Sequence, residues 1–324
     1  MTLLLRAASH QRIGLGLAAV GRPGYITLGR RSDLPEVRSP EALEERAFEL
    51  MDTAYSHGVR YIDTARSYGR AESFLAEWLD TRSEIKDLVI GSKWGYTYTA
   101  DWRTEADVHE VKDHSVSAYR RQVAETRARL GDRLSLYQVH SVTPDSPALS
   151  DTALHEQLAQ LSTEGVTVGL STSGPHQADT IRAALTVTVG GKPLFGCVQT
   201  TYNLLERSAC SALAEAHAAG RAVIIKEALA NGRLTASHLA TPQMNALHEI
   251  ARQTGTSCDA VALAAVIAQP WADIVLSGAA TVDQLTSNLA ATHVHLNPAQ
   301  LERLTELTEP SDAYWAHRSR LAWT

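Results

Sequence analysis

The segment Gly58-Val-Arg-Tyr-Ile-Asp-Thr-Ala-Arg-Ser-Tyr-Gly69 contains a short β-rich run, Arg60–Asp63, followed by a polar turn that leads into a helical pattern at Ala71–Leu79. The same order of strand, turn and amphipathic helix recurs along the chain without a clear linker. Strands that alternate with helices form parallel sheets, because each helix returns the chain to the starting edge of the sheet. The pattern therefore predicts an α/β fold.

Eight strand-and-helix units can be distinguished. The expected strands are Ile13–Val20, Arg60–Asp63, Leu88–Lys93, Leu134–His140, Val166–Ser171, Phe195–Gln199, Ala222–Lys226 and Ile274–Ser277. The expected helices are Pro40–His57, Ala71–Leu79, Ser115–Leu130, Ala148–Thr163, His176–Leu185, Ser208–Ala219 and Ser257–Ala268. Eight units favour a closed (β/α)8 TIM barrel in a single domain over residues 1–324. A doubly wound sheet would show G-x-G-x-x-G after its first strand, and Gly14-Leu-Gly-Leu-Ala-Ala-Val does not.

Composition and charge exclude several classes of protein. The chain has 324 residues, of which 44% are hydrophobic and 20% charged, as in a globular protein with ample core material. Its formal charge is −6 and no run of Lys or Arg could follow a phosphate backbone, so nucleic acid is not an expected partner. No apolar span approaches the roughly 20 residues of a membrane helix. Arg6 interrupts the apolar stretch Met1–Leu5 before a signal-peptide core develops, so a cytoplasmic location is expected.

Cysteine and histidine patterns give no metal or disulfide site. The three cysteines, Cys197, Cys210 and Cys258, form no CxxC pair. His293-Val-His295 lacks a further ligand, and Asp107–His114 is more simply explained as a solvated loop. We therefore expect no metal.

Two long connections, 21–39 and 94–114, exceed the length of most unstructured loops in compact domains and are expected to be functional. The second follows the C-terminal end of a strand, the face where barrel active sites are built. Its aromatic side chains are expected to form a wall against an organic substrate, with packing of the loop onto the barrel as the alternative: Trp94, Tyr96 and Trp102.

Four polar residues are expected to meet at this same rim. Asp63, Lys93 and His140 end three successive strands, and Tyr68 lies in the loop after the first of them. A nearby Lys93 ammonium would favour tyrosinate, so we expect it to lower the pKa of Tyr68 and fit this phenol for proton transfer. Asp63 would hold Lys93, and His140 could donate a hydrogen bond to a substrate oxygen.

The surroundings of these residues resemble the aldo-keto reductase superfamily from Gly14 to about Ala291. The resemblance is carried by the segment 58–69 quoted above and by Ile90-Gly-Ser-Lys93, Tyr137-Gln-Val-His140 and Val198-Gln-Thr-Thr-Tyr-Asn203. It implies a catalytic tetrad of Asp63, Tyr68, Lys93 and His140. In this tetrad Tyr68 is the general acid for reduction and the general base for oxidation. NADPH or NADH is implied as the cofactor, extended across the barrel mouth.

The same resemblance implies a set of cofactor-binding positions: Gly16, Leu17, Ser171, Thr172, Gln199, Lys226, Leu229, Ser277, Gly278, Ala279, Gln284 and Asn288. Thr172 replaces the family's Asn beside the nicotinamide carboxamide, and Lys226 stands where an aromatic ring usually stacks on the nicotinamide. Ala280 and Gln284 occupy places where basic residues commonly grip the 2′-phosphate of NADP. The choice between NAD and NADP therefore stays open.

These observations lead to a main functional hypothesis and one alternative. The first is an NAD(P)(H)-dependent oxidoreductase that acts on a small aldehyde, ketone or sugar-like alcohol. The alternative is a nucleotide-binding barrel that serves as a sensor or accessory subunit with little turnover. Arg66 could meet the substrate or lie on the surface, and the tail 309–324 is expected to fold over the barrel mouth, as it does in relatives. The pattern does not indicate the oligomeric state.

Overall fold

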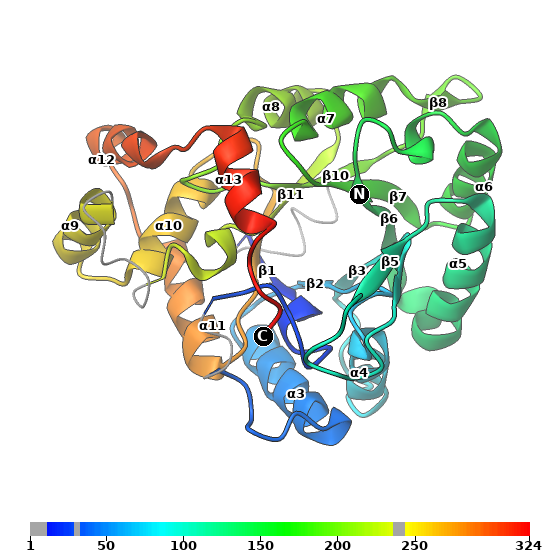
Figure 1. Cartoon of the computed structure of the whole chain (residues 1–324), viewed down its shortest axis with the longest axis horizontal. Coiled ribbons are helices and arrows are strands. Elements are labelled where there is room, and N and C mark those ends of the chain that lie inside the picture. Colours follow the sequence, from blue (N-terminus) through cyan, green and yellow to red (C-terminus); the bar gives the residue numbers. More distant parts are fainter. Residues whose placement is uncertain (1–11, 29–32, 236–243) are drawn as a thin grey trace.

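In the computed structural model, which describes residues 12–28, 33–235 and 244–324, eight parallel strands close into a barrel surrounded by helices (Figure 1). Around the barrel the strand order is β1-β12-β11-β10-β7-β6-β3-β2. The strands are β1 (Ile13–Gly16), β2 (Tyr61–Asp63), β3 (Val89–Trp94), β6 (Leu134–Val142), β7 (Thr167–Thr172), β10 (Cys197–Thr201), β11 (Ala222–Lys226) and β12 (Ile274–Ser277). The expected (β/α)8 TIM barrel is confirmed.

The helices cover the outside of the barrel. Those at the expected places are α3 (Pro40–Ser56), α4 (Ala71–Asp80), α5 (Val116–Leu130), α6 (Thr152–Thr163), α7 (Gln177–Thr186), α8 (Cys210–Ala218) and α10 (Cys258–Ile267). In the described part of the chain, four further helices were not expected: α9 (Asn245–Thr254), α11 (Val282–Leu289), α12 (Pro298–Leu304) and α13 (Ser311–Arg318). The expected helix at Ala148–Thr163 is divided, because Asp151 caps a new helix start by accepting a hydrogen bond from the amide of Leu154.

A tyrosine fills the middle of the barrel. Tyr61 on β2 is fully buried inside it and packs in a cluster with Leu136 and Ile224 of the facing strands. A Cβ atom on Gly14 would lie 2.8 Å from the Tyr61 ring, and one on Gly91 would clash with its hydroxyl. Glycine is therefore required at both positions to leave space for this ring.

The long connection 94–114 is not an unstructured loop. It contains an antiparallel pair of strands, β4 (Tyr96–Tyr98) and β5 (Glu110–Lys112), at one side of the barrel opening (Figure 1). The first barrel strand is also shorter than expected, because the chain turns into a 3-10 helix at Leu17–Ala19. The apolar stretch Met1–Leu5, which Arg6 interrupts, lies outside the described residues.

The C-terminal segment crosses the barrel opening. Helix α13 and the residues after it lie in front of the strands in Figure 1. Backbone hydrogen bonds join Thr324 to Tyr25 in both directions, at 3.1 and 3.3 Å. The tail is thereby attached to the loop that follows β1.

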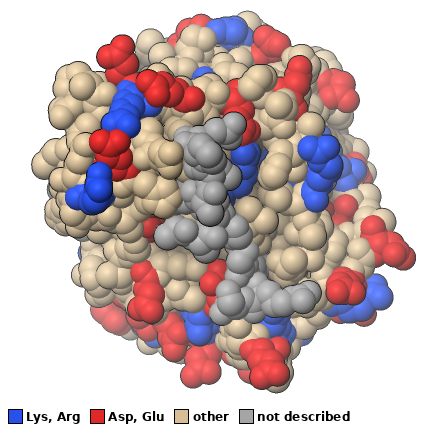
Figure 2. All heavy atoms as spheres, turned by 60° about the vertical axis from the view of Figure 1, so that its left-hand side comes forward, with Lys and Arg blue, Asp and Glu red and all other residues tan. Residues whose placement is uncertain are grey.

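The surface charge and the apolarity of the helices show the same mixed character as the composition. Acidic and basic side chains are interspersed over the face seen in Figure 2, which carries no broad surface of one sign. No helix among the described residues combines the length and apolarity needed to cross a bilayer.

The packing of Tyr61 gives a first prediction. Gly91→Ala should lower the free energy of unfolding by about 1–3 kcal/mol, because the new methyl group overpacks the barrel interior. The loss should be smaller in a Tyr61→Phe background, which removes the clashing hydroxyl. Gly278→Ala, where a Cβ meets nothing within 4 Å, is the matched control. Urea denaturation of the four variants measures these differences, and an additive Gly91 and Tyr61 effect would contradict the packing argument.

Candidate active site

A cavity of about 790 Å³ opens at the C-terminal ends of the barrel strands. At one end it is lined by the strand-end residues and the segments that fold over them: Arg22, Tyr25, Asp63, Tyr68, Tyr96, Glu110, His140, Gln199, Lys226, Glu227, Arg318 and Trp323. The other end lies between the end of β12 and the starts of α10 and α11, and its lining includes Asp259, Ser277, Gly278, Ala280, Asp283, Gln284 and Asn288.

A buried ion pair forms the floor of the first end. The Lys93 ammonium contacts the Asp63 carboxylate and donates to the carbonyl oxygen of Thr64 at 3.0 Å. The other carboxylate oxygen of Asp63 accepts from the Tyr61 hydroxyl at 3.1 Å and from the Gln199 amide at 2.8 Å. Two buried charges are thus paired and hydrogen-bonded, which their removal from water requires.

Tyr68 lies directly above this pair. Its hydroxyl is 3.4 Å from Lys93 Nζ, and the Lys93 ammonium lies 4.9 Å from its ring centre. Burial, with the neighbouring Asp63 charge, raises the pKa of Tyr68 well above its ordinary value. The expected lowering of this pKa is therefore wrong for the structure, because loss of phenolate solvation outweighs the nearby cations. At neutral pH the Tyr68 hydroxyl carries its proton.

His140 faces Tyr68 from the end of β6. The two rings meet edge to face with centres 5.5 Å apart, and the register between β6 and β7 shifts after Val139. Ser141 adopts a positive φ of 57° there, and its amide donates to the Ser171 hydroxyl. This bulge turns His140 and Ser141 toward the cavity. Burial, with the charges of Lys93 and Lys226, lowers the pKa of His140 well below its ordinary value, so its imidazole is neutral.

A second ionic network borders the cavity at the end of β11. Lys226 Nζ donates to the Thr201 hydroxyl at 2.8 Å and lies 3.6 Å from Glu227. Glu227 holds a positive φ of 54° and is bound through two nitrogens by Arg318 of α13, with Nε at 2.8 Å. Burial lowers the pKa of Lys226 to about 8, and Arg318 with Lys226 lowers that of Glu227 to about 2 despite its burial.

The sequence did not single out Glu227, Arg318 or Arg22. Arg22 lies in the connection 21–39 and is 2% exposed; its guanidinium donates to the Ser67 carbonyl at 2.7 Å and to Glu110 at 2.8 Å. It sits 5.5 Å from the ring centre of Tyr68. The loop length pointed to this segment, but no local signal identifies an arginine whose partner is 88 residues away.

Most of the cofactor positions implied by the resemblance line the cavity, and three do not. Those that line it are Gly16, Gln199, Lys226, Leu229, Ser277, Gly278, Ala279, Gln284 and Asn288. Leu17 is fully buried in the main hydrophobic core. The Ser171 hydroxyl accepts a hydrogen bond from the Ser141 amide. The Thr172 hydroxyl lies within hydrogen-bond distance of the Gln177 and Thr200 side chains.

Of the four substrate positions, the structure brings only Tyr96 to the cavity, where its ring lies 5.1 Å from that of His140. Trp94 is fully buried between the rings of His114 and Tyr119. Trp102 donates to the carbonyl of Arg38 and packs against Phe74. Arg66 pairs with Glu72 and Glu125 on the outer side. These three side chains pack the loops instead of facing the cavity.

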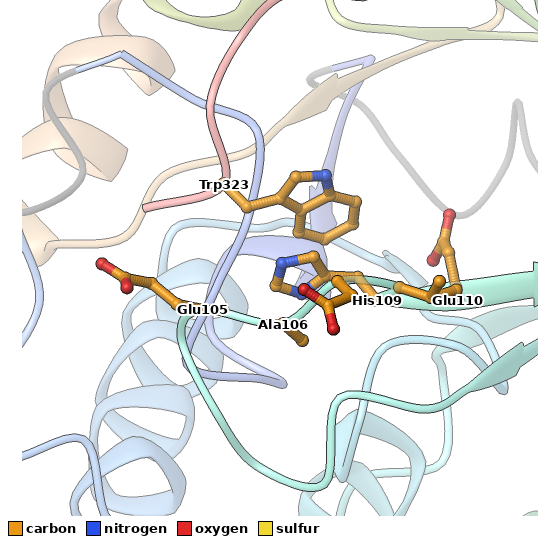
Figure 3. A pocket seen from close by; sticks show the side chains of 7 residues that line it. Glu105, Ala106, His109, Glu110 and Trp323 are labelled. Carbon is orange, nitrogen blue, oxygen red and sulfur yellow. The ribbon is translucent and has the colours of Figure 1, made fainter.

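An outer pocket of about 470 Å³ adjoins the hairpin formed by β4 and β5 (Figure 3). The Trp323 ring stacks on His109 with ring centres 4.2 Å apart and planes 6° apart. Trp323 and Glu110 line both this pocket and the main cavity. The tail and the hairpin therefore form the partition between the two.

Comparisons with known proteins agree on one family. The model of the Aldo/keto reductase family matches residues 13–309. Protein tas of Escherichia coli (strain K12) is 26% identical over 303 residues, which cover 78% of this chain and 86% of that protein. A solved aldo-keto reductase from Bacillus halodurans, in its holo form, has a TM-score of 0.68 at 20% identity and 92% coverage of each chain. A Klebsiella pneumoniae aldo/keto reductase in complex with NADP and acetate has a TM-score of 0.65 at 20% identity, covering 91% of this chain and 90% of its own.

The Glu227–Arg318 pair gives a second prediction. Glu227→Gln should lower the free energy of unfolding by about 3 kcal/mol, because it leaves Arg318 without its charge partner at a largely buried site. The stabilisation by Glu227 is present above pH 4.5 and is lost as the pH falls toward about 2, so the difference between variant and wild type should narrow over that window.

Glu215→Gln, which breaks the exposed Arg182–Glu215 pair, is the control and should change stability little. Denaturant titrations at several pH values measure both variants. An equal effect of the two substitutions would contradict the assigned role of Glu227.

Proposed function

This chain belongs to the aldo/keto reductase family and is an NAD(P)-dependent oxidoreductase, and we propose that it uses Tyr68 as the proton-transfer residue for a carbonyl or alcohol substrate. The hydride would pass between nicotinamide C4 and an aldehyde, a ketone or a sugar-like alcohol. The observation that carries the proposal is the meeting of Tyr68, His140 and the Asp63–Lys93 pair at one end of a large cavity.

The cavity fits an extended dinucleotide. Gly16 and Gly278 present bare backbone to it, and a Cβ on Gly278 would meet nothing within 4 Å. Helix α11 begins beside it after Thr281, and a helix start favours phosphate groups. Gln199 would contact the nicotinamide end, and Ser277, Gly278 and Ala279 the phosphates. Bound there, the nicotinamide would supply or accept the hydride.

Tyr68 is suited to give a proton in the reductive direction. Its raised pKa keeps the hydroxyl protonated at neutral pH, so it can donate to a carbonyl oxygen as negative charge develops there. Lys93, 3.4 Å from the hydroxyl, would then stabilise the phenolate that is left. Asp63 and the Thr64 carbonyl keep the Lys93 ammonium in position. In the oxidative direction the same phenolate would take the proton from an alcohol.

His140 supplies a hydrogen bond without a charge. A neutral imidazole has one N–H donor, and the cavity position of His140 beside Tyr68 would direct it to the same substrate oxygen. Such a fixed donor in a buried site stabilises a developing oxyanion more than water does. Ser67, 3.4 Å from Nδ1, helps to fix the ring.

The substrate end of the cavity combines aromatic and cationic side chains. The rings of Tyr25, Tyr96 and Trp323 line it together with Lys226 and Arg22. Aromatic walls with a few directed polar groups suit an aromatic or hydroxylated carbonyl compound. We propose Tyr96 and Lys226 as substrate contacts.

The alternative, a nucleotide-binding barrel with little turnover, rests on Thr172 and Lys226 at the nicotinamide positions. A protein that only binds nucleotides does not need the Tyr68 phenol beside the Lys93 ammonium. Burying the Asp63–Lys93 pair costs desolvation free energy, and nucleotide binding alone does not account for that cost. The catalytic reading accounts for both groups.

Replacing Tyr68 separates the two readings and is our third prediction. Tyr68→Phe should lower kcat for carbonyl reduction by about 10²–10⁴-fold, the usual contribution of a general acid, with cofactor binding retained. Reductase assays at 340 nm with an aromatic aldehyde measure the loss. Tyr55→Phe, on the surface of α3 beside Asp87, is the control and should keep full activity. Undiminished turnover in Tyr68→Phe would show that another group donates the proton.

A further inference from the structure

We propose that the far end of the cavity selects NAD(H) over NADP(H), through the carboxylates of Asp259 and Asp283. The inference rests on the proposed function, since it requires a nicotinamide dinucleotide in the cavity. It assigns a role to residues on α10 and α11 that the proton-transfer chemistry does not use.

The position of the adenosine end follows from the cavity itself. Hydride transfer requires the nicotinamide to lie beside Tyr68 and His140. The cavity continues from there along Gly16 and the end of β12 to the first turns of α10 and α11. The adenosine ribose and its 2′ substituent must therefore lie near these two helices.

The two ends of the cavity differ in charge. Among the described residues that line it, the cations are Arg22, Lys226 and Arg318, all at the catalytic end. At the far end the charged side chains are three carboxylates: Asp33, Asp259 and Asp283. Within the described part of the chain none of these three aspartates forms an ion pair with Lys, Arg or His. Residues 29–32, next to Asp33, lie outside that part.

One arginine lies close to the far end and is directed elsewhere. Arg46 on α3 donates through one terminal nitrogen to the carbonyl oxygens of Asp33 at 3.2 Å and Ala280 at 3.0 Å. Its Nε pairs with Glu49 at 3.1 Å. Arg46 therefore ties α3 to the backbone beside the cavity and is not one of the side chains that line it.

Both carboxylates stand at helix starts beside the cavity. Asp259 stands in the first turn of α10, and the Asn288 amide, oriented so that its oxygen accepts from the Ser277 hydroxyl, donates to Asp259 at 2.9 Å. Asp283 stands in the first turn of α11, which favours an acidic side chain. Asp259 is therefore held by a hydrogen bond, whereas the exposed Asp283 is placed by its position in the first turn alone.

The chemistry of the 2′ position then decides the preference. A ribose 2′-hydroxyl can donate to a carboxylate, as it does in other dinucleotide sites. A 2′-phosphate is mostly deprotonated at neutral pH and carries a charge of about −1.5 to −2, so carboxylates repel it. Because no cation among the described residues at this end is placed to pair with that phosphate, NADP(H) should lose that contact and gain the repulsion.

Direct binding tests the inference without any turnover. Quenching of protein fluorescence by NADH and by NADPH should give a Kd for NADH at least about tenfold lower. The ratio should fall as salt is raised, because screening weakens the repulsion at the partly buried Asp259 and the exposed Asp283. Asp283→Asn should tighten NADPH binding several-fold and leave NADH binding equal or weaker, and Ala280→Arg should tighten NADPH binding further.

The matched control is Asp179→Asn, which removes an aspartate from the first turn of α7 away from the cavity and should leave both affinities unchanged. Equal or tighter binding of NADPH by the wild type would overturn the inference and leave the proposed oxidoreductase function standing. Failure of both nucleotides to bind would overturn the proposed function itself.

Discussion

The ion pair between Asp63 and Lys93 is the constraint on which the interior of this barrel depends. An ammonium and a carboxylate removed from water are tolerated only when each is paired and further hydrogen-bonded. Tyr61 and Gln199 donate to the carboxylate, and Thr64 accepts from the ammonium. Because the Tyr61 ring has to reach Asp63 from inside the barrel, the two neighbouring strands β1 and β3 carry glycine where its ring and hydroxyl pass.

The same burial fixes the protonation states above the pair. Loss of solvation keeps Tyr68 protonated and His140 neutral, although both lie close to cations. The site therefore holds a proton donor and a neutral hydrogen-bond donor side by side at neutral pH. Charge also differs along the cavity: cations and carboxylates both line the catalytic end, whereas the charged side chains described at the far end are carboxylates. One cavity can thus bind a reacting group at one end and discriminate nucleotides at the other.

Sequence reasoning succeeded where the signal is local. The period of strands and helices predicts the barrel, and residues that end successive parallel strands must meet at one rim, which brings Asp63, Lys93 and His140 together. It failed where the outcome depends on distant partners. Glu227 and Arg318 are 91 residues apart, and no sequence pattern near either residue predicts that they form an ion pair.

Side-chain direction was the other limit. Trp94 and Tyr96 stand two positions apart in one aromatic run, yet the strand turns after Trp94 at Gly95 with a φ of 107°. Trp94 is consequently buried under α5 while Tyr96 reaches the cavity. The direction of the pKa shift of Tyr68 was likewise set by its degree of burial, which a list of neighbouring charges does not supply.

The central claim is that hydride is transferred at the Tyr68 end of this cavity, and isotope transfer tests it most directly. The purified protein would be incubated with an aromatic aldehyde and with NADH or NADPH that carries one deuterium at nicotinamide C4, on one face of the ring in the first experiment and on the other face in the second. The alcohol product would then be analysed by mass spectrometry. The account predicts one deuterium at the carbinol carbon, from one face only and in proportion to the cofactor oxidised. Tight cofactor binding with no deuterated alcohol from a broad panel of aldehydes and ketones would contradict it and favour a nucleotide-binding barrel.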